Sequence, residues 1–191
     1  MSYEYKTKPF EHQRQALQSG GLKKVFAYLM EMGTGKTKVT IDDASCLYQQ
    51  NKITLLIVIA PNSVYQNWKE ELRAHCPCET NIFMHKIDKN FKPVDNKMNI
   101  LLMNVEAFSH KSGVTFLESI LKFFGKKTMM VVDESTTIKN RTAKRTKSLI
   151  RLGQLASYRR ILTGSPITKS PLDLFSQFEF LNPGLLGTDN F

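Results

Sequence analysis

The chain has 191 residues, 41% of them hydrophobic, and a formal net charge of +10 from 27 basic and 17 acidic side chains. This length and apolar content favour one compact domain, and three cysteines, an odd number, argue against a disulfide-bonded secreted protein. No apolar stretch reaches the roughly 18 residues that a membrane-spanning helix needs, and the first residues lack the apolar segment of a secretory signal. We therefore expect a cytoplasmic protein that does not bind a membrane.

Apolar segments of strand length alternate with segments of helical periodicity along the chain. The predicted strands are residues 25–30, 54–60, 81–85, 100–103, 129–132 and 160–162. The predicted helices are residues 10–19, 36–50, 63–75, 115–124, 142–152 and 171–180. Most of the strands are almost continuously apolar, which is typical of parallel strands covered on both faces. We predict an α/β three-layer sandwich with a mainly parallel central sheet, and ligands at the carboxyl ends of its strands.

A glycine-rich segment, residues 33–37 (Gly-Thr-Gly-Lys-Thr), follows the first predicted strand. The backbone N–H groups of such a turn point at phosphate oxygens, and the next helix presents its positive dipole end to the same anion. Lys36 adds a charge for the outer phosphates, and Thr37 offers a hydroxyl to Mg²⁺. Met30 stands where the strict pattern has its first glycine, so the segment alone also fits a turn whose lysine merely faces solvent.

An acidic pair, Asp133 and Glu134, ends the fifth predicted strand and supplies the second half of a nucleoside-triphosphate site. Asp133 can hold the water shell of Mg²⁺, and Glu134 can orient and deprotonate the attacking water. Because both halves occur in the required order, we predict a nucleoside triphosphate and Mg²⁺ as cofactors. The predicted catalytic residues are Lys36, Asp133 and Glu134, and the predicted metal ligands are Thr37 and Asp133.

The excess of basic over acidic side chains favours an anionic binding partner. Nucleic acid is the first candidate, because a basic face gains affinity by displacing the counterions condensed on a phosphate backbone. Charge alone fits equally well a protein with many solvated lysines and no such partner. Several basic residues follow the acidic pair, within residues 139–147, and the choice there lies between backbone binding and a solvated helix face.

The order of the motifs resembles the first motor lobe of superfamily-two helicases and translocases, most closely their Swi/Snf-like branch. Residues 10–13 (Phe-Glu-His-Gln) are similar to the adenine-recognition motif of that branch. Residues 31–37 resemble its motif I, where Glu-Met-Gly-x-Gly-Lys-Thr is the usual wording and explains the missing glycine. Motif Ia is matched by residues 60–71, motif Ib by 103–106, motif II by 131–140 and motif III by 162–167. The resemblance covers nearly the whole chain.

This resemblance implies further roles. The nucleotide would be held by Phe10, Gln13, Met32, Gly33, Thr34, Gly35, Lys36 and Thr37. A nucleic-acid backbone, DNA before RNA, would be contacted independently of sequence by Pro61, Asn62, Ser63, Asn104, Lys139 and Arg141. The state of the nucleotide would be coupled to that face by Thr163, Gly164 and Ser165.

The implied function is that of an ATP-dependent DNA helicase or translocase, with residues 1–191 as one RecA-like ATP-binding lobe. Family motors hydrolyse ATP between two such lobes, and the second lobe supplies arginines that stabilise the transition state. No second sheet is predicted after residue 180, so we expect this chain alone to hydrolyse ATP weakly or not at all. Thr136 stands where the family usually has a motif II histidine, which puts the coupling of hydrolysis to movement in doubt.

Two other classes stay open. A small-molecule kinase would need an acceptor pocket and a lid with arginines late in the chain, where the only pair is Arg159 and Arg160. A non-motor module could bind nucleic acid or a partner protein and keep its nucleotide site.

Two smaller features are interpreted as structural rather than functional. Trp68, Phe123 and Phe124 could stack on bases, but aromatic residues among apolar neighbours are more often core, and we expect core here. The segment 75–78 (His-Cys-Pro-Cys) with His85 lacks the paired spacing of structural zinc sites, so we expect no zinc.

Overall fold

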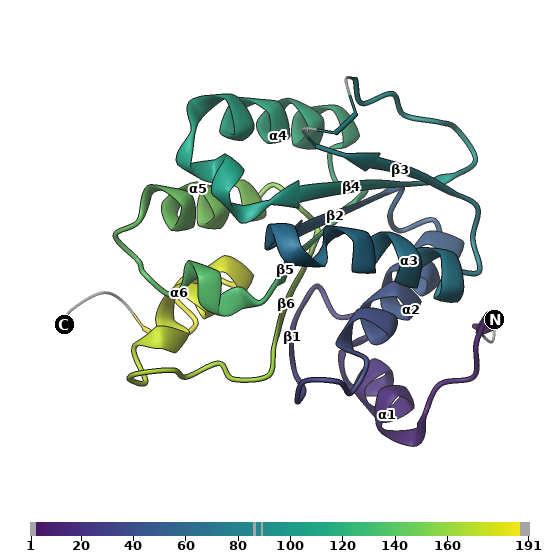
Figure 1. The fold of residues 1–191 in the computed structure, drawn as a ribbon, viewed down its shortest axis with the longest axis horizontal. Helices are drawn as coiled ribbons and strands as arrows, with labels where there is room; N and C mark the ends of the chain where they lie inside the picture. Colours follow the sequence, from purple (N-terminus) through teal and green to yellow (C-terminus); the bar gives the residue numbers. More distant parts are fainter. Residues whose placement is uncertain (1–2, 86, 89, 188–191) are drawn as a thin grey trace.

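The computed structural model describes residues 3–85, 87–88 and 90–187, so the ends of the predicted domain 1–191 lie outside the described residues. Within these residues, six strands form one sheet between two layers of helices (Figure 1). The strand order is β1-β6-β5-β2-β4-β3, and every neighbouring pair is parallel. The predicted three-layer α/β fold is confirmed, with a fully parallel sheet.

All the predicted strands and helices are present, with ends displaced by about one helical turn or less. The strands are β1 (Val25–Leu29), β2 (Leu55–Ala60), β3 (Thr80–Met84), β4 (Met98–Asn104), β5 (Thr128–Asp133) and β6 (Tyr158–Thr163). The helices are α1 (Glu11–Gly20), α2 (Lys36–Gln49), α3 (Tyr65–His75), α4 (Lys111–Phe124), α5 (Lys144–Gly153) and α6 (Asp173–Leu181). Short 3-10 helices follow three strands: η1 (Asn62–Val64), η2 (Val105–Ser109) and η3 (Ser135–Ile138).

Among the helix starts, that of α4 differs most from the prediction, by four residues, and those of α3, α5 and α6 each differ by two. Helix α4 begins a turn early, and Gly113 in its first turn has a packing reason: a Cβ there would lie 2.4 Å from the carbonyl oxygen of Ala107. Helix α5 begins late because Asn140 Oδ1 accepts hydrogen bonds from the backbone N–H and the hydroxyl of Thr142, at 3.1 and 2.9 Å. Such a side-chain turn competes with helix formation.

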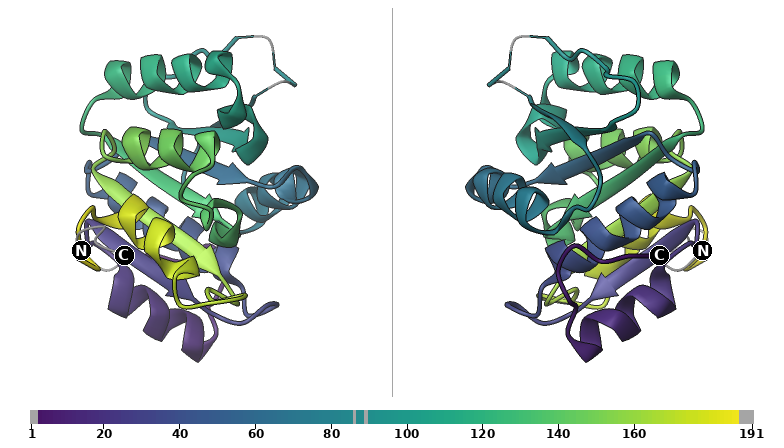
Figure 2. Two further views of the ribbon diagram at one scale, coloured as in Figure 1. Left: turned by 90° about the vertical axis from the view of Figure 1, so that its left-hand side faces the viewer. Right: turned by 90° about the vertical axis from the view of Figure 1, so that its right-hand side faces the viewer.

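The sheet buries both of its faces because successive side chains of a strand point to opposite sides. Leu56 and Val58 of β2 pack in a cluster with residues of α2 and α3, with α1 at its margin. Leu55, Ile57 and Ile59 pack instead with residues of α4, α5 and α6. The left view of Figure 2 shows α4, α5 and α6 one above another across their face of the sheet.

A buried ion pair links helix α2 to strand β6 of the sheet. Arg160 of β6 has no exposed surface, and its Nε donates a hydrogen bond of 2.7 Å to Asp43 Oδ2 on α2. The hydroxyl of Tyr28 donates to the same oxygen at 3.0 Å, and Arg160 also donates to the carbonyl of Gly20 at 3.3 Å. The guanidinium therefore joins β6 to α1 and α2, and Asp43 extends the link to Tyr28 of β1. No helix of the described part of the chain is both long and apolar enough for a membrane span.

Candidate nucleotide-binding site

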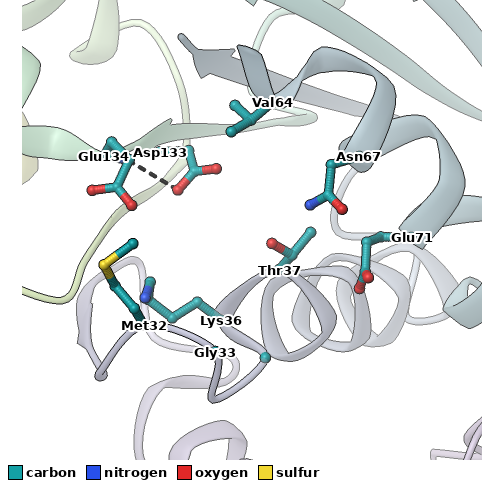
Figure 3. A pocket seen from close by; sticks show the side chains of 10 residues that line it. Met32, Gly33, Lys36, Thr37, Val64, Asn67, Glu71, Asp133 and Glu134 are labelled. Atoms are coloured by element: carbon teal, nitrogen blue, oxygen red, sulfur yellow. Dashed lines mark hydrogen bonds between the residues drawn. The ribbon is translucent and has the colours of Figure 1, made fainter.

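A cavity of about 300 Å³ opens at the carboxyl ends of the strands, between the loop after β1, helix α3 and the end of β5 (Figure 3). The parallel sheet explains this place, since all its strands end at the same edge. The cavity is lined by Met32, Gly33, Gly35, Lys36, Thr37, Val64, Asn67, Glu71, Asp133 and Glu134. The structure thus brings together the glycine loop and the acidic pair, about a hundred positions apart in sequence.

The loop after β1 takes its shape from two glycines. Gly33 and Gly35 have φ angles of 76° and 82°, a left-handed backbone that glycine adopts without steric cost. Lys36 begins α2, and its Nζ donates to the carbonyl oxygens of Met30 and Glu31, each at 3.0 Å. The ammonium is therefore fixed over the loop at the amino end of α2, where the helix dipole also favours an anion.

Gln13 supports this loop from α1. Its Oε1 accepts a hydrogen bond from the backbone N–H of Phe10, and its Nε2 donates to the carbonyl of Thr34, both at 3.0 Å. Gln13 is 5% exposed, whereas the ring of Phe10 is 70% exposed. Phe10, Gln13 and Thr34 do not line the cavity itself. The role of Phe10 and Gln13 in adenine recognition stays a prediction.

Replacing Gly35 with alanine is expected to lower the free energy of unfolding more than replacing Gly33. A left-handed backbone costs a residue with a Cβ about 1–2 kcal/mol at either position. Among the described residues, nothing lies within 4 Å of a Cβ built at Gly33, whereas at Gly35 it would lie 2.3 Å from Gln13 Nε2. Urea denaturation of both variants measures the difference, and equal losses would contradict the supporting role of Gln13.

Asp133 is 8% exposed and held by two donors. Its Oδ2 accepts a hydrogen bond from the indole Nε1 of Trp68 at 2.8 Å, and its Oδ1 accepts one from the backbone N–H of Glu134 at 2.9 Å. Burial raises the pKa of Asp133, and these two bonds oppose the rise. Burial, followed by the nearby charge of Asp133, also raises the pKa of Glu134, a direction that suits a general base.

The donor set fits a magnesium ion. Mg²⁺ prefers oxygen ligands and usually keeps several waters, with only one or two protein ligands beside the phosphates. Thr37 and Asp133 line the same cavity, and a carboxylate oxygen that accepts one hydrogen bond keeps a second lone pair for another partner. Together they offer a hydroxyl and a carboxylate to the ion and its water shell.

The aromatic predictions have mixed outcomes. Trp68 is fully buried, as predicted, although nothing in the sequence indicated its bond to Asp133. The prediction is wrong for Phe123, which is 74% exposed, while Phe124 is half-buried. The buried face of α4 carries Leu117 and Leu121 at a spacing of four, and Phe123 falls outside that stripe.

The expected nucleic-acid residues lie at the carboxyl edge of the sheet but differ in exposure. Asn62 and Ser63 are exposed in η1, and Pro61 before them is half-buried. The expected surface position of Asn104 is wrong. This residue is 1% exposed, because the last residue of β4 points into the protein rather than to the surface. Among the described residues, Asn104 Oδ1 has no hydrogen-bond partner.

The basic segment after η3 also lies at this edge. Arg141 is exposed, while Lys139 is half-buried and its Nζ donates to the hydroxyl of Thr168. On α5, Lys144 and Lys147 line a second hollow, of about 440 Å³, whose other walls come from η2 and α4. No acidic residue lines this hollow in the part of the chain that the structure describes.

The expected coupling residues form the turn after β6, and one of them, Gly164, lies close to the loop after β1. Thr163 is buried, and its Oγ1 accepts a hydrogen bond from the backbone N–H of Ser165 at 3.2 Å. A Cβ on Gly164 would lie 3.3 Å from the carbonyl oxygen of Met30 and from the backbone nitrogen of Met32. The turn after β6 therefore lies too close to the loop after β1 to accept a side chain at Gly164 without a small shift, although coupling itself stays a prediction.

Sequence reasoning missed a buried link between the end of β5 and this turn. The hydroxyl of Ser135 donates to Gln177 Oε1 at 2.5 Å, and Gln177 Nε2 donates to the carbonyl of Pro166 at 2.9 Å. Gln177 has no exposed surface, whereas Thr136, at the usual histidine position, is half-buried. The signal was a glutamine amid the apolar residues of a predicted helix.

No group of three or more histidine, cysteine, aspartate or glutamate side chains in the described ranges is arranged to hold a metal ion. Cys76 and Cys78 lie close together, with the Cys76 thiol 3.6 Å from the carbonyl oxygen of Cys78. The expected absence of zinc stays a prediction.

A parallel sheet with a glycine loop after its first strand and an acidic pair after β5 defines the P-loop class of α/β domains. Within this class, the family model described as SNF2-related domain matches residues 28–191, and the chain belongs to this family. The solved Sulfolobus solfataricus SWI2/SNF2 ATPase core in complex with dsDNA is 30% identical with a TM-score of 0.82, over 98% of this chain and 38% of that one.

Several curated proteins are similar to most of this chain. Protein CHROMATIN REMODELING 19 of Arabidopsis thaliana is 29% identical over 84% of this chain, and human DNA repair and recombination protein RAD54B is 30% identical over 83%. Mouse DNA annealing helicase and endonuclease ZRANB3 is 34% identical over 83%. The chain spans only 22%, 17% and 14% of these three relatives, respectively.

Proposed function

We propose that this chain is the ATP-binding first motor lobe of an ATP-dependent DNA helicase or translocase. The convergence of Lys36, Thr37, Asp133 and Glu134 on one cavity is the observation that carries the proposal. Membership of the SNF2-related family and the names of the relatives, which include a DNA annealing helicase and a DNA repair protein, support the motor class.

We expect the residues that line the cavity, together with Phe10 outside it, to have distinct roles. The loop N–H groups and Lys36 would bind the phosphates, and Phe10, exposed at the start of α1, would stack on adenine. Thr37 and Asp133 would hold Mg²⁺, which when bound neutralises charge on the outer phosphates. Glu134 would orient the attacking water and accept its proton.

Hydrolysis by the 191-residue polypeptide alone is expected to be slow. In this family, arginines of a second lobe would complete the site. An arginine that reaches the transferred phosphate from across an interface raises the hydrolysis rate by about 10³–10⁵-fold. Steady-state turnover, measured with and without duplex DNA, checks this expectation. Brisk DNA-stimulated turnover by this polypeptide would contradict it, while phosphate transfer to a small acceptor would favour a kinase.

We also propose that the carboxyl edge binds a nucleic-acid backbone independently of sequence. Replacing Lys144 and Lys147 together with alanine is expected to weaken duplex binding and to flatten its salt dependence. The slope of log K against log salt should fall by about 0.9 for each phosphate that the protein no longer neutralises. A matched variant removes the exposed Lys126 and Lys127, which precede β5 at the opposite edge, and should keep the wild-type slope. Equal slopes in both variants would contradict the placement.

Thr136 favours one alternative, a non-motor module that binds nucleotide without coupled movement. This alternative predicts tight Mg²⁺-ATP binding that DNA does not change. A motor lobe predicts that duplex DNA and Mg²⁺-ATP alter the affinity of one another, since coupling between two sites is reciprocal.

A further inference from the structure

Helix α3 contributes one side chain to the site that the motif chemistry leaves without a role. Trp68 is the only tryptophan of the chain, and it is fully buried. Its indole N–H donates the 2.8 Å hydrogen bond to Asp133 Oδ2, and thus joins α3 to the end of β5. A buried indole N–H needs a hydrogen-bond acceptor, and here the acceptor is the carboxylate of a predicted metal ligand.

This bond, together with one other, determines how the carboxylate lies. The backbone N–H of Glu134 holds Oδ1 at 2.9 Å, while the indole holds Oδ2. With one donor on each oxygen, the plane of the carboxylate is fixed, and a lone pair on each oxygen stays free. A hydrogen bond to a charged acceptor is also stronger than one between neutral groups.

Two other side chains of α3 line the same cavity. Val64 of η1 and Asn67 and Glu71 of α3 line it, and Asn67 and Glu71 lie across from Thr37 (Figure 3). Trp68 is therefore carried by an element that already borders the cavity of the predicted metal ligands. The side chain of Leu72, one turn further along α3, is also buried and anchors the helix on the sheet.

We infer that Trp68 is a positioning residue for Mg²⁺, which fixes Asp133 in the orientation that the ion and its water shell require. This inference rests on the proposed Mg²⁺-ATP site. Partners that orient metal ligands typically change metal affinity by about 10–100-fold when they are removed. The indole should therefore matter for the metal and much less for the nucleotide without metal.

The test replaces Trp68 with phenylalanine, which keeps a buried ring and removes the N–H donor. Binding of a fluorescent ATP analogue is measured over a series of Mg²⁺ concentrations and again in a chelator. We expect the Mg²⁺ concentration for half-maximal binding to rise about tenfold in Trp68→Phe, with unchanged affinity in the chelator. Phe180→Leu, which trims a buried ring on the other face of the sheet, should keep the wild-type Mg²⁺ dependence.

A second measurement uses the wild-type protein and does not depend on the variant folding. A ¹⁵N-labelled sample has one indole N–H resonance, and we expect it to shift on addition of Mg²⁺ with a non-hydrolysable ATP analogue. The same resonance should move in Asp133→Asn. An unchanged Mg²⁺ dependence in folded Trp68→Phe, or an indole resonance insensitive to Mg²⁺ and nucleotide, would overturn the inference alone. Absence of any Mg²⁺-dependent binding by the wild type would overturn the proposed function, and this inference with it.

Discussion

Replacement of Arg160 with leucine is expected to lower the free energy of unfolding by about 3–5 kcal/mol, because it removes one partner of a buried ion pair. Both side chains of the Arg160–Asp43 pair have no exposed surface. Without the guanidinium, Asp43 would keep only the hydroxyl of Tyr28, since its other oxygen has no hydrogen-bond partner among the described residues. Urea denaturation monitored by circular dichroism measures the loss.

The matched control is Arg151→Ala. Arg151 also pairs with a carboxylate, that of Glu118 at 3.0 Å, but on the surface, where water and salt screen the interaction. This variant should unfold close to the wild-type denaturant concentration. If Arg160→Leu were no less stable than Arg151→Ala, the buried pair would not contribute to the free energy of unfolding as expected.

Replacement of Lys36 with alanine is expected to abolish the stabilisation of the protein by Mg²⁺-ATP. A ligand present at 100 times its Kd stabilises the folded state by about 2.7 kcal/mol, which is readily seen as a rise in Tm. Lys36 lies in the cavity with its Nζ held over the glycine loop, so its removal takes away the charge nearest the expected phosphates. Thermal unfolding with and without Mg²⁺-ATP measures the effect.

Lys126→Ala is the control for this experiment, because it removes an exposed lysine at the opposite edge of the sheet. Its nucleotide-dependent rise in Tm should equal that of the wild type. Equal rises in Lys36→Ala and the wild type would place the nucleotide elsewhere.

The layered fold and the grouping of the site could both be predicted, for one physical reason. Continuous apolar strands mean a parallel sheet, and a parallel sheet brings every strand end to one edge. Residues 36 and 133 were therefore expected at the same edge of the sheet, and the strand order β1-β6-β5 brings them to one cavity. The order of strands and helices can be predicted without knowledge of any side-chain contact.

The contacts that hold the site could not be predicted, because each joins side chains from different elements. Nothing near Trp68 in the sequence points to Asp133, and nothing near Ser135 points to Gln177. Asn104 shows a second limit, since a shift of one residue at a strand end moves a side chain from the surface to the core.

Equilibrium titration of the wild-type chain with ATP, in the presence of Mg²⁺ and again in a chelator, tests the central claim most directly. The arrangement of Lys36, Thr37 and Asp133 around one cavity predicts saturable binding of one nucleotide per chain, weakened when Mg²⁺ is removed. A folded protein that shows no saturable binding of ATP in either condition would contradict the assignment of this cavity as a nucleotide site.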